Sequence, residues 1–311
     1  MADTEARSVA HFGHRECRWS VASDDHRMVE LAAELYFPLL TEAPGTARDP
    51  DGAPTAGDGA RLPPAVAYVL QPPTGDALGE LRRDGKRIRR GGSPARLLEA
   101  LVWSINQQVI GAEPDATRLH AAGASDDAGR VVALPAPMEA GKTTLVTSLL
   151  DHGLAYLSDE ALLIDGDLHV AGYAKPLSID RGSWELLAHH RPQLEHEMMP
   201  FMAQQWLVPP HRFTDIRRSG RLAAMVFPRY EPDAATSLTL LGGADALELA
   251  MAATFHLDGG PLPVARVREL AEIVTGVPTY RLVSGRLDEA TTRVLEVLAS
   301  APEVLESNSQ P

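Results

Sequence analysis

The sequence has few of the features that membrane-spanning or disulfide-bonded proteins need. It contains one cysteine, Cys17, among 311 residues, which excludes an intramolecular disulfide. No apolar run approaches the roughly 18 residues of a membrane span, and residues 1–8 lack the basic and then apolar pattern of a signal peptide. We therefore expect a cytoplasmic protein without a membrane partner.

Basic residues are also in the minority. The chain has 29 Lys and Arg against 42 Asp and Glu, and its net charge of -13 repels phosphate backbones. We therefore expect no nucleic-acid partner. Hydrophobic residues make up 44% and charged residues 23% of the chain, which is typical of globular proteins and argues against disorder, collagen or coiled coil for most of it.

Composition and periodicity divide the chain into three regions. Residues 1–112 are predicted to form an N-terminal α+β region, residues 113–300 an α/β core, and residues 301–311 a disordered tail. Residues 43–64 contain mostly Pro, Gly, Ala, Asp and Thr, which predicts a mobile loop. The apolar patterns predict helices at 28–36, 94–110, 141–152, 244–255, 264–274 and 287–298, and strands at 66–70, 130–134, 155–157, 222–227 and 237–241.

The segment most informative about function reads VVALPAPMEAGKTTLVTSLL. An apolar strand leads into a loop that ends in Gly141, Lys142 and Thr143, and a helix follows. A phosphate-binding loop needs backbone N–H groups at a helix N-terminus, a long cation for the outer phosphates and a hydroxyl for magnesium. The loop residues expected to bind the nucleotide are Ala136, Met138, Glu139, Ala140, Gly141, Lys142, Thr143 and Thr144.

Two residues depart from the usual pattern of such loops. Ala136 stands at the position of the first glycine, and Glu139 must point outward to leave room for phosphates. The alternative interpretation is a chance junction of strand, glycine and helix that binds no nucleotide.

Paired carboxylates follow the loop helix in the segment YLSDE. Asp159 and Glu160 come at the end of an apolar strand. Acids at this place are typical of magnesium binding and of accepting a proton from an acceptor hydroxyl. A solvated acidic turn is the alternative.

These motifs together resemble the HPr kinase/phosphorylase family, especially its divergent HPr-kinase-related members. The likeness is carried by LHAAGA, VVALPAPMEAGKTT, YLSDEALLID and KPLSID, and it is strongest over residues 118–180. The resemblance implies a P-loop kinase core related to HPr kinase and phosphoenolpyruvate carboxykinase. It also implies ATP and Mg²⁺ as cofactors and a serine-type hydroxyl of a peptide or small protein as the acceptor, and homo-oligomers are common in the family.

The resemblance also assigns roles to individual residues. Lys142 would bind the β- and γ-phosphates, Thr143 would ligate magnesium, Asp159 would be the base and Glu160 would support the metal. The family has two aspartates where this chain has Asp and Glu, so Asp159 and Glu160 are both candidates for either role. His120 matches a histidine before the loop strand and is either catalytic or structural. A kinase of small-molecule alcohols and a non-catalytic nucleotide sensor are the alternative functions.

A basic hairpin is the most distinctive feature outside this core. An Asp84-Gly85 turn lies within a run of six cations, which is either a solvated face or a docking patch for an acidic partner. These cations are Arg82, Arg83, Lys86, Arg87, Arg89 and Arg90. Trp103, Trp184 and Trp206 are expected in the core, and Lys175, Arg181 and Arg229 are further candidate cations for transition-state charge.

Overall fold

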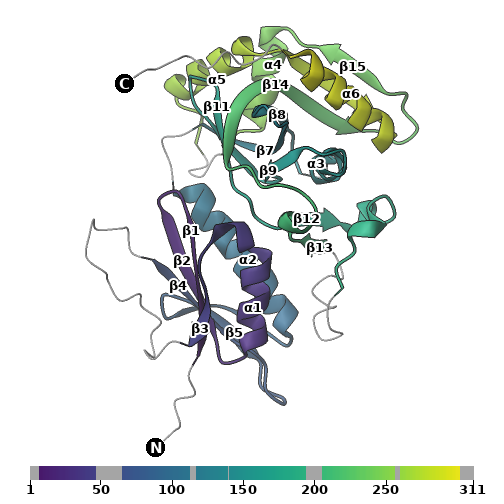
Figure 1. Cartoon of the computed structure of the whole chain (residues 1–311). Helices are drawn as coiled ribbons and strands as arrows, with labels where there is room; N and C mark the ends of the chain where they lie inside the picture. The colour runs from purple at the N-terminus through teal and green to yellow at the C-terminus, as the bar shows by residue number, and fades with distance from the viewer. Residues whose placement is uncertain are drawn as a thin grey trace, which may run out of the picture. The chain divides into compact units, whose positions relative to one another are not determined.

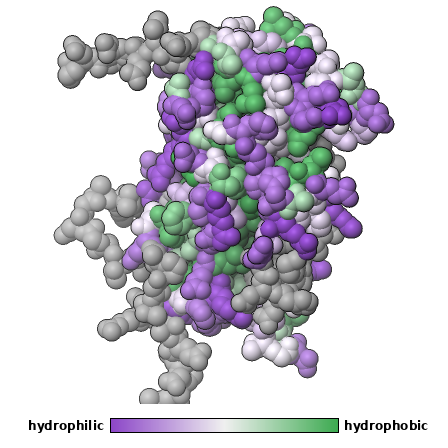
Figure 2. All heavy atoms as spheres, turned by 45° about the vertical axis from the view of Figure 1, so that its right-hand side comes forward, coloured by the Kyte–Doolittle hydropathy of each residue, from purple (hydrophilic) through white to green (hydrophobic). Residues whose placement is uncertain are grey.

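The computed structural model describes residues 7–46, 65–112, 117–138, 140–193, 205–255 and 260–301. Within these residues the chain is a mixed α/β protein with six α-helices and sixteen strands, which confirms the α/β class (Figure 1). No helix in the described ranges is long and apolar enough to cross a membrane. Hydrophilic residues cover much of the described surface on the face in Figure 2, with smaller hydrophobic areas between them.

The chain divides into two compact units. The first comprises Met1–Pro114 and Ser178–Pro209, and the second comprises Asp115–Leu177 and Pro210–Pro311. The division made from the sequence assigned 178–209 to the core. In the structure β12 (Leu177–Asp180) and β13 (Gln205–Val208) instead form a separate two-stranded sheet. Of the predicted tail, only Ala301 belongs to the described residues.

The first unit contains a six-stranded sheet in the order β3-β1-β2-β4-β5-β6. Helix α1 packs on β1, β2 and β3, α2 packs on β5 and β6, and the two helices contact each other. Rings of Phe12, Trp19 and Tyr36 meet beneath α1, with centroids 5.6 to 6.1 Å apart. The elements are β1 (Ser8–His14), β2 (Cys17–Ser23), α1 (His26–Leu35), β3 (Leu40–Thr46), β4 (Val66–Gln71), β5 (Gly79–Arg83), β6 (Lys86–Gly91) and α2 (Pro94–Gly111).

The predicted hairpin and both predicted helices of this unit are confirmed. Asp84 and Gly85 have φ of 49° and 74°, the left-handed backbone that a two-residue hairpin turn requires. Ser93 caps α2 by accepting a hydrogen bond from the Arg96 amide.

Two predictions for this unit are wrong in part. Residues 43–46 belong to β3, because β1 provides a partner strand that the Pro- and Gly-rich composition does not reveal; residues 47–64 lie outside the described residues. Trp103 is 66% exposed, since α2 packs through its opposite face. Trp206 is buried and stacks on the half-buried Trp184, with centroids 4.9 Å apart.

The second unit is built on an eight-stranded sheet. Its main order is β11-β10-β7-β8-β14-β16-β15, with β9 also paired to β7 and β11 also paired to β14. The strands β11, β10, β7, β8 and β14 therefore close into a ring. These strands are β7 (Thr117–Ser125), β8 (Arg130–Pro135), β9 (Ala155–Ser158), β10 (Ala161–Ile164), β11 (His169–Gly172), β14 (Ser219–Tyr230), β15 (Ser237–Leu240) and β16 (Thr279–Ser284).

Four helices cover this sheet. Helix α3 (Lys142–Asp151) packs against α6 (Leu287–Ser300), where the hydroxyls of Thr291 and Ser148 lie 2.8 Å apart. Helices α4 (Gly243–Ala252) and α5 (Val264–Gly276) pack against each other and join a core that includes Leu119, Val131 and Leu162. The predicted strand at 130–134, helix at 141–152 and strand at 155–157 are confirmed by β8, α3 and β9.

Candidate functional site

The loop between β8 and α3 has the backbone form that an anion site needs. The strand β8 is buried along most of its length, and α3 begins directly after Gly141. Gly141 has a φ of 87°, which is left-handed and favours glycine. Among the described residues no side chain caps α3, and the N-terminus of a helix is a place where proteins commonly bind anions.

The Lys142 side chain folds back into this loop. Its Nζ donates hydrogen bonds to the carbonyl oxygens of Ala136 and Pro137, both at 2.8 Å, and the residue is 6% exposed. Burial lowers the pKa of Lys142 to about 8, although the nearby carboxylates of Glu160 and Asp159 favour its charged form. The two loop carbonyls therefore bind the Lys142 ammonium, which phosphate oxygens could bind in their place.

Asp159 is the most enclosed acid of the site. The Thr143 hydroxyl donates to its Oδ2 at 3.2 Å, and the Tyr156 hydroxyl donates to its Oδ1 at 2.9 Å. The Lys175 ammonium forms an ion pair with Oδ1 at 2.8 Å; the Lys175 side chain is 0% exposed and the Asp159 side chain 1%. Burial, together with the negative charge of Asp159, raises the pKa of Tyr156 well above its usual value, so this phenol is a neutral donor.

Glu160 lies beside His120 because of the strand pairing. The two-residue link between β9 and β10 holds Asp159 and Glu160, and Ala161 at the start of β10 is opposite His120. His120 Nε2 is 3.8 Å from Glu160 Oε1, with side chains 19% and 30% exposed. Burial lowers the pKa of His120 to about 4, which leaves the ring neutral near pH 7, and burial raises the pKa of Glu160. His120 lies within β7, the strand that precedes the loop strand β8 in the sequence.

The structure thus brings together most of the predicted site residues. A hydrogen bond joins Thr143 to Asp159, and Glu160 lies against His120. The charges of Glu160 and Asp159 also act on Lys142. Ala136 is buried, Met138 is 81% exposed, and Glu139 lies outside the described residues, so its predicted outward direction stays a prediction.

Sequence reasoning missed one residue, and its three further candidate cations lie in three different settings. Tyr156 was not singled out, although its position three residues before Asp159 in YLSDE could have drawn attention to it. Lys175 was expected to be a cation for transition-state charge, but it is fully buried and bound to Asp159. Arg229 is exposed and pairs with Glu231 at 2.7 Å, and Arg181 belongs to the first unit.

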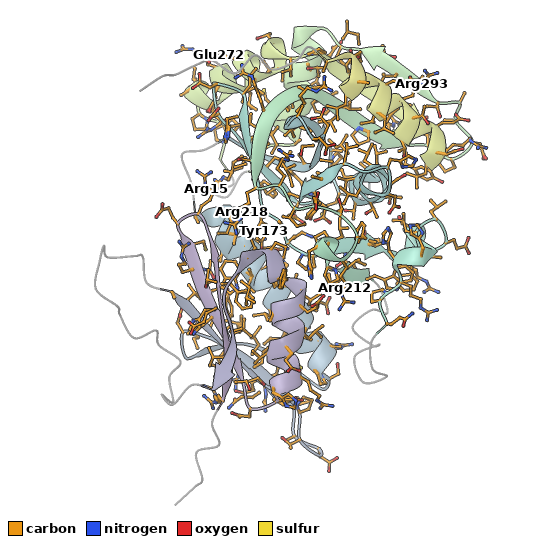
Figure 3. The ribbon with its side chains drawn as sticks, in the orientation of Figure 1. Arg15, Tyr173, Arg212, Arg218, Glu272 and Arg293 are labelled. Atoms are coloured by element: carbon orange, nitrogen blue, oxygen red, sulfur yellow. The ribbon has the colours of Figure 1, made fainter. Side chains whose placement is uncertain are left out.

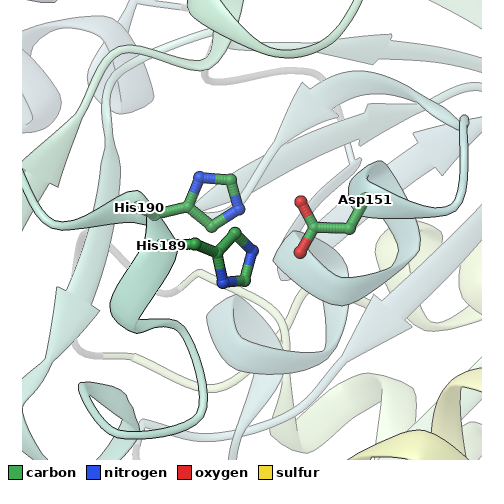
Figure 4. Close-up of side chains that lie close together, drawn as sticks. All are labelled: Asp151, His189 and His190. Carbon is green, nitrogen blue, oxygen red and sulfur yellow. The ribbon is translucent and has the colours of Figure 1, made fainter.

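A pair of histidines lies outside this site. The rings of His189 and His190, in a short 3₁₀ helix of the first unit, have centroids 4.2 Å apart (Figure 4). Asp151, also drawn there, is the last residue of α3 in the second unit.

The chain has similarity to solved structures but not to known families or curated proteins. No protein-family model matches the chain, and no curated protein matches it either. Among solved structures it is similar to the HPr(Ser) kinase/phosphatase from Coxiella burnetii, with a TM-score of 0.30 and 12% identity over 58% of this chain and 93% of that one.

Proposed function

We propose that the chain is an ATP-dependent phosphotransferase that uses Mg²⁺ and phosphorylates a serine-type hydroxyl of a peptide or small protein. The observation that carries the proposal is the contact between the Thr143 hydroxyl and Asp159, directly after the left-handed Gly141 and the buried Lys142. Amides, a long cation, a hydroxyl and a carboxylate are what transfer of a phosphoryl group requires. The serine-type acceptor rests on the sequence resemblance described above.

The donor atoms present here fit a magnesium–nucleotide complex. Thr143, Asp159 and Glu160 provide hydroxyl and carboxylate oxygens, the hard ligands that Mg²⁺ prefers. Bound magnesium would neutralise charge on the transferred phosphate. Lys142 would exchange the carbonyls of Ala136 and Pro137 for phosphate oxygens, and the amides at the start of α3 would bind the same group.

The contacts favour one division of roles between the two acids. Asp159 is held by Thr143, Tyr156 and Lys175 and is almost inaccessible, whereas the Glu160 side chain is 30% exposed. We assign Asp159, with Thr143, to the metal side and Glu160 to the acceptor hydroxyl, the reverse of the assignment implied by the resemblance.

The reaction step then follows from Glu160. Its carboxylate takes the hydroxyl proton while the hydroxyl oxygen forms a bond to the γ-phosphorus. The bond from that phosphorus to the bridging oxygen breaks, and ADP leaves with the electron pair.

A nucleotide sensor without turnover is a second candidate, and the Asp159–Lys175 pair favours it. The fully buried Lys175 ammonium lies 2.8 Å from Asp159 and already neutralises its carboxylate. A kinase could use that carboxylate for the metal or the acceptor hydroxyl. A pure sensor needs Lys142 and Thr143 but has no use for an accessible carboxylate at Glu160.

The test is phosphoryl transfer from γ-labelled ATP to serine-containing peptides in the presence of Mg²⁺. Glu160→Gln should lower kcat by about 10² to 10⁴, the usual loss when a general base is removed, while ATP affinity is kept. Asp159→Asn should raise the magnesium concentration needed for half-maximal rate. If Glu160→Gln transfers phosphate at the wild-type rate and Asp159→Asn does not, the roles are the other way round; tight ATP binding without transfer to any acceptor favours the sensor.

A further inference from the structure

The strand β6 is an edge of the six-stranded sheet. Among the described residues it pairs with β5 alone, and every residue from Lys86 to Arg90 is exposed. The outer edge of β6 therefore offers backbone N–H and C=O groups to another extended chain. Strand addition of this kind gives affinity through main-chain hydrogen bonds.

Positive charge is concentrated on this hairpin in a protein that is otherwise acidic. Strands β5 and β6 with their turn contain six basic and two acidic residues, a net charge of +4, against -13 for the whole chain. One of the two acids, Asp84, is engaged by the sheet itself, because its Oδ1 accepts a hydrogen bond from the Ala67 amide at 2.9 Å. The hairpin therefore attracts acidic ligands, which the rest of the chain repels.

Within the hairpin, arginines already bind a carboxylate. Guanidinium groups of Arg82, Arg87 and Arg90 converge on Glu80, at 2.9, 3.1 and 3.6 Å from its oxygens. These contacts lower the pKa of Glu80, the hydrogen bond from Arg87 being the largest cause. Each guanidinium has five N–H donors, so three of them around one carboxylate leave donors for further acidic groups.

We propose that β6 docks an extended acidic segment of the acceptor protein, which adds as a strand beside it and places carboxylates against the arginines. The partner class rests on the proposed function, whereas the docking itself does not. Lysines alone on an edge would serve to prevent aggregation. Five of the six cations here are arginines, whose planar fork suits carboxylates.

Other occupants fit these observations less well. A second copy paired through β6 would bring Lys and Arg side chains of both strands together, which is unfavourable. Nucleic acid would meet the same cations but also the surrounding negative charge of the chain.

The experiment measures binding of a fluorescein-labelled peptide of six Glu-Val repeats to the full chain by fluorescence anisotropy. The double variant Arg87→Glu and Arg89→Glu should bind the peptide at least about tenfold more weakly, and wild-type affinity should fall with salt. The control is Arg268→Glu with Arg293→Glu, which changes the net charge equally at exposed positions of α5 and α6. Of these two residues, Figure 3 labels Arg293 on α6. The control should bind as the wild type does. A second variant, Arg87→Gln with Arg89→Gln, adds no negative charge near Glu80 and so avoids a folding defect from charge repulsion. It should also bind the peptide weakly.

Strand addition is tested with the same peptide N-methylated at four consecutive central residues. Methylation keeps the charge but removes the amide donors, so the affinity should again fall about tenfold or more. Equal binding of the methylated peptide overturns strand addition, and equal binding to the double variant overturns docking on the hairpin. A single-stranded 20-nucleotide DNA that binds more tightly than the peptide, or a dimer that the double variant abolishes in sedimentation, also overturns it.

A last control separates this inference from the proposed function. Lys142→Ala, which should abolish ATP binding, should leave peptide affinity unchanged. Peptide binding without phosphoryl transfer to any acceptor would contradict the proposed function and leave the docking site intact.

Discussion

The Lys142 ammonium is buried, so its protonation changes the stability of the folded chain with pH. Its pKa is about 8 in the folded chain and about 10.5 when exposed, so the unfolded chain binds more protons between these values. Stability should therefore rise with pH from about 8 toward 10.5. Below pH 8 the buried ammonium destabilises the nucleotide-free fold by up to about 3 kcal/mol, since one pKa unit corresponds to about 1.4 kcal/mol.

Lys142→Met should accordingly raise the melting temperature of the nucleotide-free chain at pH 7. The difference from the wild type should shrink at pH 10, where the wild-type lysine has lost most of its proton in the folded state. Calorimetric melting at both pH values measures the effect. A variant that is less stable than the wild type at pH 7 would mean that the two carbonyl hydrogen bonds outweigh the burial of charge.

The buried pair of Asp159 and Lys175 predicts a different pattern. Asp159→Asn should destabilise the chain by about 3–5 kcal/mol, because an ammonium with 0% exposure loses its counter-ion. Adding Lys175→Met should restore much of the loss, since the uncompensated charge is then gone. Denaturant unfolding of both single variants and the double variant gives the coupling; additive losses would show that the pair is not coupled.

At the scale of elements, the sequence was most informative where local signals suffice. The caps and apolar spacing of α2, the Asp84-Gly85 turn and the succession β8, α3 and β9 could all be predicted. Each of them depends on residues close together in the chain. The glycine, lysine and threonine of the loop and the acid pair could be predicted for the same reason.

Elements that depend on distant partners were missed. The strands β1 and β2 pair with β3 and β4, and β2 is buried at nearly every position, so it lacks the alternation of a half-exposed strand. The hairpin of β10 and β11 was also missed, although Asp165 and Gly166 between its strands are a local turn signal. The role of Lys175 was also hidden, because only folding brings it to Asp159.

Gly141 allows a prediction at the start of α3. Gly141→Ala should destabilise the chain by about 1–2 kcal/mol through its left-handed φ, and it should also weaken ATP binding because the loop amides are displaced. Gly153→Ala is the matched control. It has a φ of 92° with no atom within 4 Å of an added Cβ, and it lies beyond the helix. Its stability loss should be similar, with normal ATP affinity in titration calorimetry; equal weakening in both variants would contradict a special role for Gly141.

For the whole molecule, the proposed function predicts stabilisation by nucleotide. ATP with Mg²⁺ at about 100-fold over Kd should stabilise the chain by about 2.7 kcal/mol, because the ligand binds the folded state alone. Lys142→Ala should remove this shift, while Arg268→Glu should keep it. A melting temperature that does not change with millimolar ATP and Mg²⁺ would exclude nucleotide binding at this loop.

The segments of the two units alternate along the chain, and this sets the order in which the units are completed during synthesis. Residues 115–177 leave the ribosome before 178–209, so the first unit is complete only after part of the second has been made. Within the second unit, β8 cannot pair with its parallel neighbour β14 until β14, which begins at Ser219, has been synthesised. At 5–20 residues per second the strand that leads into the Lys142 loop stays uncovered on one edge for roughly 5–20 s. A nascent chain paused in this interval exposes an apolar strand edge, and this is the stage at which we expect a chaperone to bind.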